Sequence, residues 1–256
     1  MSYEPEPQEW TEKFPFSQEL QVIDAPSYRK WLAEVCPQMK GVKPLPGPKI
    51  CKEGIPIGKF RFGVMEMKTH RMGSPWEGMG IPLQLCSGKL RKMRSTLSIA
   101  QGRKRGEVAF TGPVKIPVLH DEFGNVWMSL TPMEVITQRA GVRKAKGRVL
   151  MGGLGMGWLA RKVCEKKTVK SLVVHEKDKD VANFFGEQLV RDFGRKINIF
   201  VKDVYAGMNG NTRKFDTVLM DIWSDFHGAE YDHKFTELVK THPRVWGWGY
   251  HPERSW

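Results

Sequence analysis

The carboxyl-terminal part of the chain alternates between short apolar runs and segments with helical periodicity. The apolar runs predict strands at 148–151, 171–175, 197–201, 217–220 and 245–249. The helical patterns between them predict helices at 158–166, 178–193 and 231–241. Strands that alternate with crossover helices are typical of a parallel sheet with helices on both faces. We therefore expect an α/β fold here, with its ligand at the carboxyl ends of the strands.

The amino-terminal part of the chain is less regular. Residues 1–58 are rich in proline and turn signals, and we predict one helix there with Ser27 as its N-cap. Periodicity is weak over 59–113, where we expect short strands and exposed loops. These features indicate a smaller, irregular and β-containing region at 1–113.

A hairpin and a helix precede the predicted sheet. The pattern over 114–129 indicates two strands joined by a turn. Thr131 and Glu134 then have the spacing of a capping box, so we expect a helix at 132–140. A basic linker leads from this helix to the first strand of the sheet. We assign all of these elements to one α/β domain at 114–256.

Charge indicates a class of partner. The 256 residues carry a formal net charge of +13, with cations gathered at 89–94, 103–105, 139–148 and 166–170. A basic surface raises the local concentration of anions, which favours a polyanion such as nucleic acid. We expect such contact to be non-specific, because no base-reading motif accompanies the basic clusters. The alternative is a solvated basic surface that has no partner.

The apolar runs and the cysteines argue against membrane, secreted and metal-binding classes of protein. No apolar run is long enough to span a bilayer, and the acidic, proline-containing start is typical of neither a signal peptide nor an anchor. The four cysteines lie far apart, without a pair at metal-binding spacing, which predicts neither a bound metal nor a disulfide framework. We therefore expect a reducing, cytoplasmic setting with no membrane contact.

Glycines follow the first predicted strand and precede a helix. Gly153, Gly155 and Gly157 lack side chains at the place where a backbone can approach a ligand closely. A dinucleotide fingerprint would need glycine at Trp158, and a phosphate loop would need Gly-Lys followed by Ser or Thr. The spacing fits neither motif, and the three glycines are candidate cofactor-binding residues of another kind.

Acidic residues follow the next two predicted strands. Glu176 could accept hydrogen bonds from two ribose hydroxyls, or it could be an exposed loop acid. Asp203 could accept from an adenine amino group, or it could cap a turn. Asp178 has the position of a helix N-cap.

The fourth predicted strand delivers Asp221 to the same edge of the sheet. Burial there would raise the pKa of its carboxyl unless a cationic amine were present, which suits a substrate-amine anchor or a general base. The alternative is a carboxylate bonded to backbone donors of a neighbouring loop. Trp223 follows closely and could stack on a sulfonium or a base, although tryptophan is commonly part of a core.

Together, these segments resemble the spermidine synthase branch of the class I S-adenosylmethionine-dependent methyltransferase fold, over about residues 121–225. The resemblance implies a Rossmann-like sheet and S-adenosylmethionine as the cofactor. It also implies that Glu176 binds ribose, that Asp203 lies on the adenine side, and that Asp221 belongs to the catalytic site.

Three departures from the spermidine synthase pattern weaken the case for aminopropyl transfer. Met156 stands where those enzymes have an aspartate thought to hold the amine of decarboxylated S-adenosylmethionine. Their second catalytic-site carboxylate is lost or displaced to Asp225, a candidate substrate-binding residue together with Trp223. The sequence stops at Trp256, which leaves room for about five strands and no antiparallel pair, so the fold looks truncated at its carboxyl terminus.

We therefore expect an S-adenosylmethionine-dependent transferase, namely a methyltransferase that acts on a small-molecule or polyanionic acceptor. A polyamine aminopropyltransferase is the alternative among enzymes. A non-catalytic basic module that binds a nucleoside or nucleic acid is the alternative from another class.

Overall fold

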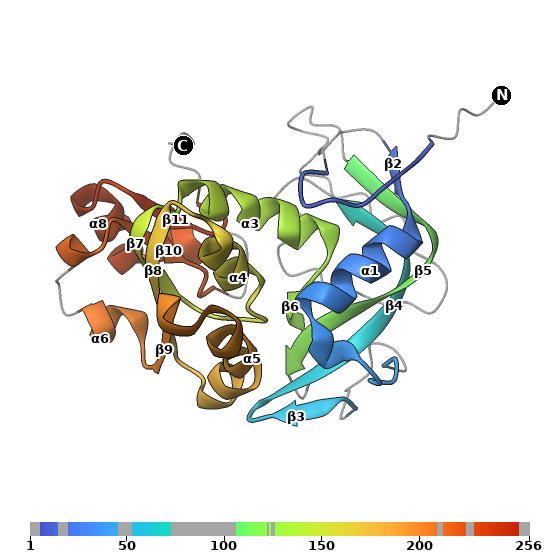
Figure 1. Cartoon of the computed structure of the whole chain (residues 1–256), viewed down its shortest axis with the longest axis horizontal. Coiled ribbons are helices and arrows are strands. Elements are labelled where there is room, and N and C mark those ends of the chain that lie inside the picture. The colour runs from blue at the N-terminus through green and yellow to red at the C-terminus, as the bar shows by residue number, and fades with distance from the viewer. Residues whose placement is uncertain are drawn as a thin grey trace. The chain divides into compact units, whose positions relative to one another are not determined.

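The computed structural model describes residues 6–14, 20–45, 53–72, 106–121, 123, 126–208, 212–223 and 228–250. The basic clusters at 89–94 and 103–105 and the candidate Asp225 lie outside these residues. Contacts divide the chain into two compact units, Met1–Ile136 and Thr137–Trp256. Each unit contains its own sheet (Figure 1). No helix in the described part of the chain has the length and apolar character needed to cross a membrane.

The first unit contains a mixed six-stranded sheet in the order β1-β2-β5-β4-β3, with β6 paired to β5. Its strands are β1 (Pro7–Gln8), β2 (Leu20–Ile23), β3 (Ile55–Ile57), β4 (Phe60–Met72), β5 (Gly106–Asp121) and β6 (Val126–Ser129). The expectation of short strands over 59–113 is wrong, because β4 and β5 are long and pair antiparallel along most of their length. Cross-strand contact with a distant segment stabilises them, and a local pattern does not report such contact.

Helix α1 (Ala25–Val35) lies in the first unit, followed by the short 3₁₀ turn η1 (Pro37–Met39). Its N-cap is Asp24, so the prediction of Ser27 as the cap is wrong. The carboxylate of Asp24 accepts from the Ser27 backbone N–H at 2.8 Å, and the Ser27 hydroxyl donates to the Asp24 carbonyl. The helix therefore begins three residues earlier than predicted, with Pro26 in the first turn, where proline is tolerated.

The predicted hairpin is confirmed as the antiparallel pair β5 and β6. The helix after it, α3 (Pro132–Lys144), is longer than expected and includes most of the segment interpreted as a basic linker. The Lys166 ammonium donates to the carbonyls of Arg143 and Ala145 at 3.0 and 2.7 Å, which satisfies groups at the end of this helix. The division between the two units falls after Ile136, within α3, and β5 runs continuously through residue 113.

The second unit contains a five-stranded, wholly parallel sheet in the order β11-β10-β7-β8-β9. Its strands are β7 (Gly147–Gly152), β8 (Val169–Glu176), β9 (Ile197–Val201), β10 (Thr217–Met220) and β11 (Val245–Gly247). Its helices after α3 are α4 (Trp158–Glu165), α5 (Lys179–Phe193), α6 (Val204–Met208), α7 (Gly228–Tyr231) and α8 (His233–Thr241), with 3₁₀ turns η2 (Gly194–Lys196) and η3 (Thr212–Lys214). If the five strands are numbered 1 to 5 in chain order, they lie in the order 3-2-1-4-5 from β9 to β11. This is the arrangement of a Rossmann-like sheet.

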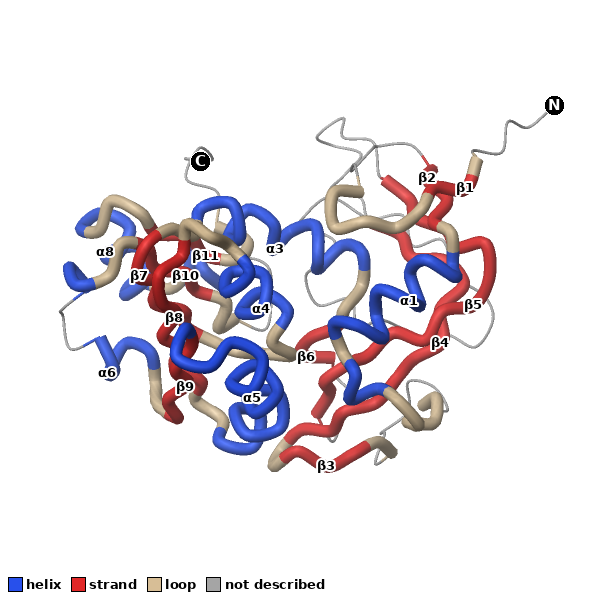
Figure 2. The backbone as a smooth tube through the Cα atoms, viewed as in Figure 1, coloured by secondary structure: helices blue, strands red, loops and turns tan. Residues whose placement is uncertain are grey.

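Helices cover both faces of this sheet, as predicted. Helices α4 and α5 lie on one side of the strands, and α6 and α8 lie on the other (Figures 1 and 2). On the second side, Leu150 and Val218 pack with Phe235 of α8 in a buried apolar cluster. The central strands β7 and β10 are mostly buried and read as continuous apolar runs, so the sequence pattern located them closely.

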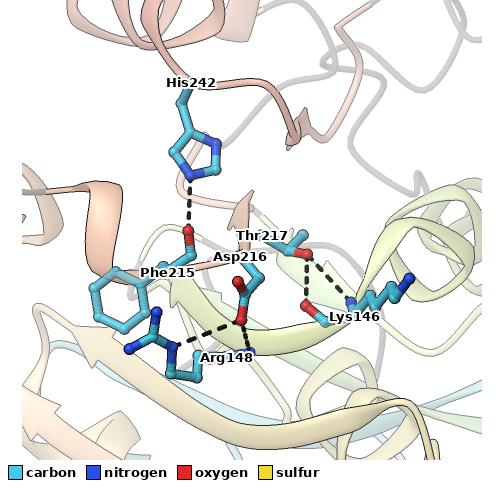
Figure 3. Close-up of polar contacts among 6 residues, drawn as sticks. All are labelled: Lys146, Arg148, Phe215, Asp216, Thr217 and His242. Atoms are coloured by element: carbon cyan, nitrogen blue, oxygen red, sulfur yellow. Dashed lines mark hydrogen bonds and ion pairs between the residues drawn. The ribbon is translucent and has the colours of Figure 1, made fainter.

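Polar contacts join the amino ends of β7 and β10 (Figure 3). The Asp216 carboxylate accepts from the Arg148 backbone N–H at 2.7 Å and lies 3.6 Å from the Arg148 guanidinium. Both groups of Arg148 hold the pKa of Asp216 below its ordinary value, and the hydrogen bond from the backbone N–H has the larger effect. The Thr217 hydroxyl accepts from the Lys146 N–H and donates to the Lys146 carbonyl. Asp216, part of the segment that resembles spermidine synthases, therefore lies at the edge opposite the strand ends that carry Glu176 and Asp221.

Candidate functional site

The ends of three neighbouring strands meet around the glycine turn that follows β7. The Gly153 N–H donates to the His175 carbonyl at the end of β8, at 2.9 Å. The Asp221 N–H, just after β10, donates to the Gly152 carbonyl, also at 2.9 Å. Strand β7 pairs with β8 on one side and β10 on the other, so the chain order reverses at this point. Ligands of open α/β sheets bind at such a switch point.

The glycine turn needs its glycines for conformational and steric reasons. Gly153, Gly155 and Gly157 have φ of +82°, +52° and +81°, a region that other residues rarely adopt. A Cβ on Gly153 would also overlap the carbonyl oxygen of Asp221. Gly157 is the N-cap of α4, and a Cβ there would lie 3.0 Å from Leu189. The turn is therefore packed closely against the end of β10 and against α5.

Glu176 connects the glycine turn to the start of the next helix. One carboxylate oxygen accepts from the Leu154 N–H at 2.8 Å, and the other accepts from the Asp178 N–H at 2.8 Å. Each oxygen can accept a second hydrogen bond, which leaves capacity for two ligand hydroxyls. The half-buried Glu176 is thus a fixed acceptor and not an exposed loop acid.

Asp221 has a perturbed carboxyl group. Burial, followed by the nearby charge of Glu176, raises its pKa from 3.8 to about 7. One of its oxygens accepts from the Gln138 side-chain amide at 2.9 Å. A carboxyl group with this pKa can hold or release a proton near neutral pH, and a neighbouring cation would favour its ionised form.

Sequence reasoning missed Gln138. Its side chain is 2% exposed, and it lies on α3, far from Asp221 in sequence. A single glutamine in a helix carries no signal that separates a partner of a distant carboxylate from an ordinary polar residue. The packing of α3 against the sheet of the second unit decided this contact.

The structure gives Asp203 and Trp223 local partners. Asp203 is exposed, and its carboxylate accepts from the Ala206 N–H at 3.0 Å, as in the turn-capping alternative. The Trp223 ring packs against Phe235 with centroids 5.0 Å apart, and its indole N–H donates to Asp232 at 3.2 Å. Roles for Asp203 toward adenine and for Trp223 toward a substrate stay predictions.

Two further positions bear on the site. Asp178 is the N-cap of α5, as predicted, because its carboxylate accepts from the Asp180 and Val181 N–H groups. Met156, within the glycine turn, is 4% exposed. Its thioether side chain brings no charge to the turn.

Comparisons with known proteins show no family for this chain. No protein-family model matches the chain, and no curated protein matches it. Among solved structures, 55 chains match. A SAM-dependent methyltransferase from Agrobacterium tumefaciens is 12% identical, with 70% of this chain and 69% of that chain covered and a TM-score of 0.32.

A second match is the Delta(1)-pyrroline-2-carboxylate reductase of Thermococcus litoralis, whose structure holds NADH and L-proline. It is 19% identical, with 43% of this chain covered and a TM-score of 0.28. The matched region spans about a third of the reductase, 36% of its length. The Rossmann-like assignment of the second unit accordingly rests on its strand order and not on these matches.

Proposed function

We propose that the second unit binds S-adenosylmethionine and that the protein is an S-adenosylmethionine-dependent methyltransferase. The observation that carries the proposal is the glycine turn at the switch point of the sheet, bonded through the Leu154 N–H to Glu176. A ligand whose ribose hydroxyls meet Glu176 would have its adjoining part beside the glycine turn. Asp203, at the end of β9, is the acceptor proposed for the adenine amino group.

The residues of the turn fit this cofactor. Gly153 and Gly157 pack closely against Asp221 and Leu189, which holds the turn beside the carboxyl ends of the strands. Met156 offers no countercharge to an ammonium, which favours S-adenosylmethionine over its decarboxylated form, the cofactor of aminopropyl transfer. The absence of an acid at this position supports methyl transfer.

Asp221 is proposed to serve the acceptor. Bound S-adenosylmethionine would supply a methyl group carried on its sulfonium. Gln138 holds one oxygen of the Asp221 carboxylate, and the other can take the proton that the acceptor nucleophile loses. Because its pKa is about 7, Asp221 is mostly ionised and able to act as a base only above neutral pH, unless the cofactor's positive charge lowers that value.

Isothermal titration calorimetry of the full chain tests the proposal with S-adenosylmethionine, S-adenosylhomocysteine, decarboxylated S-adenosylmethionine and NADH as separate ligands. We expect micromolar binding of the first two. Glu176→Ala should weaken binding by about 10- to 100-fold, because a charged acceptor of hydroxyl groups is lost. Glu187→Ala removes an exposed acid of α5 and should leave the affinity unchanged.

Each contrary outcome has a distinct meaning. Binding of NADH without binding of S-adenosylmethionine would indicate a dinucleotide enzyme. Binding of the decarboxylated form at least tenfold more tightly would favour a polyamine aminopropyltransferase. If the protein bound none of these ligands, the non-catalytic basic module would be the remaining hypothesis. Thermal unfolding of the unliganded variants shows whether Glu176→Ala acts on binding or on the fold of the turn.

A further inference from the structure

Lysine or arginine precedes every strand of the five-stranded sheet. The residues are Lys146 before β7, Lys166 and Lys167 before β8, Arg195 and Lys196 before β9, Arg213 and Lys214 before β10, and Arg244 before β11. All five strands are parallel, so their amino ends lie at one edge of the sheet. Cations that are far apart in the chain therefore gather opposite the proposed cofactor site.

Hydrogen bonds and an ion pair connect these segments along the edge. The Lys196 ammonium donates to the Lys166 carbonyl at 2.9 Å, which joins the starts of β9 and β8. The Lys166 ammonium in turn reaches the end of α3. Arg148 and Asp216 join β7 and β10 (Figure 3), and the Val218 N–H donates to the Arg244 carbonyl beside β11. The edge is thus one continuous surface of the second unit.

Most of its cations are exposed. We name as the basic edge the exposed residues Arg143, Lys144, Lys146, Arg148, Lys167, Lys170, Arg195, Arg213 and Lys214. The segments that carry them, 142–148, 165–170, 194–197, 212–217 and 242–245, contain two acids, Asp216 and Glu165. Asp216 pairs with Arg148, and Glu165 pairs with Lys162. The positive charge of the edge is therefore largely uncompensated within these segments.

The edge lacks apolar anchors. The large hydrophobic side chains that are exposed in the described part of the chain all lie outside these segments. Protein interfaces concentrate aromatic anchors and are depleted in lysine, and membrane-binding surfaces insert apolar side chains. A row of cations without such anchors fits a partner recognised by its charge.

We propose that the basic edge binds the phosphate backbone of nucleic acid without reading its bases. Neighbouring strands lie about 4.8 Å apart, so the five strand starts span roughly 19 Å, long enough to contact several consecutive phosphates. The proposal is independent of the cofactor, because the edge lies at the opposite ends of the strands. It applies to single strands and duplexes alike, since both present a row of phosphates.

Fluorescence anisotropy of the full chain with labelled random-sequence oligonucleotides, single-stranded and duplex, tests this proposal. The edge variant combines Lys146→Gln, Lys167→Gln, Lys170→Gln and Arg213→Gln. The control combines Lys177→Gln, Lys179→Gln, Lys202→Gln and Lys234→Gln, which remove the same net charge from exposed positions after β8 and β9 and at the starts of α5 and α8, away from the edge segments. Comparing the two separates a local site from the overall charge of the chain.

We expect the wild-type affinity to fall steeply between about 50 and 200 mM salt, because phosphate contacts release counterions. The edge variant should bind about 100-fold more weakly at low salt, and the slope of log affinity against log salt should decrease by about 3 to 4. The control should change the affinity by less than about threefold, because exposed charges farther away are screened.

Several results would overturn the proposal. These are equal weakening in both variants, an unchanged salt slope in the edge variant, sequence-selective binding, or no binding at low salt. Vesicles of phosphatidylcholine and phosphatidylserine form a further arm, and edge-dependent binding to them in preference to nucleic acid would assign the surface to membranes. Calorimetry of the edge variant with S-adenosylmethionine keeps the two proposals apart, because its cofactor affinity should equal that of the wild type.

Discussion

The two edges of the five-stranded sheet contain charged groups of opposite sign in different surroundings. At the carboxyl edge, Glu176 and Asp221 are half-buried acids, and each is bonded to a defined donor. At the amino edge, residues such as Lys146 and Lys167 are exposed cations. Burial changes the proton affinity of a group and suits chemistry at a defined atom. Exposure leaves a charge screened but accessible, which suits the attraction of a large anion.

Lys166 is an exception at the amino edge. Its ammonium donates to backbone carbonyls at the end of α3, and burial lowers its pKa from the ordinary value. Lys167, the next residue, is exposed. Adjacent lysines of one basic cluster therefore have different roles, one in the fold and one on the surface.

The largest effect is expected at the carboxyl edge, from Gly153→Ala. The new Cβ would overlap the Asp221 carbonyl at a φ of +82°, which combines a steric clash with an unfavourable backbone conformation. The free energy of unfolding should fall by about 4 kcal/mol or more, with loss of cofactor binding. Urea unfolding measures the change. Gly194→Ala is the control, because Gly194 has a positive φ of +52° but nothing within 4 Å of a Cβ, so a loss of similar size there would argue against the clash.

Asp221→Asn should remove a pH dependence of stability. The folded-state pKa of Asp221, about 7, is above its ordinary value of 3.8, so the folded state binds the proton more tightly. The resulting stabilisation is full below about pH 4 and is lost as pH rises through about 7, a change on the order of 3 kcal/mol. Urea unfolding at several pH values should show this decline in the wild type and a flatter profile in the variant. Parallel profiles would contradict the raised pKa.

Lys166→Met and Lys167→Met test whether Lys166 stabilises the fold while the adjacent Lys167 lies only on the surface. Lys166→Met should reduce the free energy of unfolding by about 2 kcal/mol, because carbonyls at the end of α3 lose a charged donor. Lys167→Met should change it by less than about 0.5 kcal/mol, as expected for an exposed residue. Thermal unfolding of the two variants provides the comparison, and equal losses would remove the distinction between them.

The smallest effect is expected from Gln138→Leu. Leucine has a similar volume but cannot donate to Asp221, so the ionised carboxylate loses about 1 kcal/mol of stabilisation. The midpoint of the pH profile of Asp221 should therefore move to higher pH by less than about one pH unit. Nuclear magnetic resonance titration of the Asp221 carboxyl group measures this shift. A midpoint that moves to lower pH would show that Gln138 does not stabilise the ionised form.

Much of the second unit follows from its sequence. Strands β9 and β10 have the predicted bounds, and the glycines between β7 and α4 mark a turn with positive φ. These features depend on local properties, namely apolar runs for the strands and the conformational freedom of glycine. The same reasoning failed for β4 and β5, whose length depends on pairing with each other across many intervening residues.

Tertiary structure decided the features that join distant segments. The order of the five strands brought Glu176, Asp221 and the glycine turn to one edge, and it brought the segments before each strand to the other. The sequence showed basic clusters, but it did not show that Arg213 and Arg195 lie on the same edge as Lys146. The contact between Gln138 and Asp221 was also decided by packing, because the two residues belong to elements that meet only in the folded chain. By itself, the sequence determined which residues carry charge and where the chain turns, since these are properties of single residues and their neighbours. Long-range pairing determined which charges share a surface, because that depends on hydrogen bonds and burial between segments far apart in the chain.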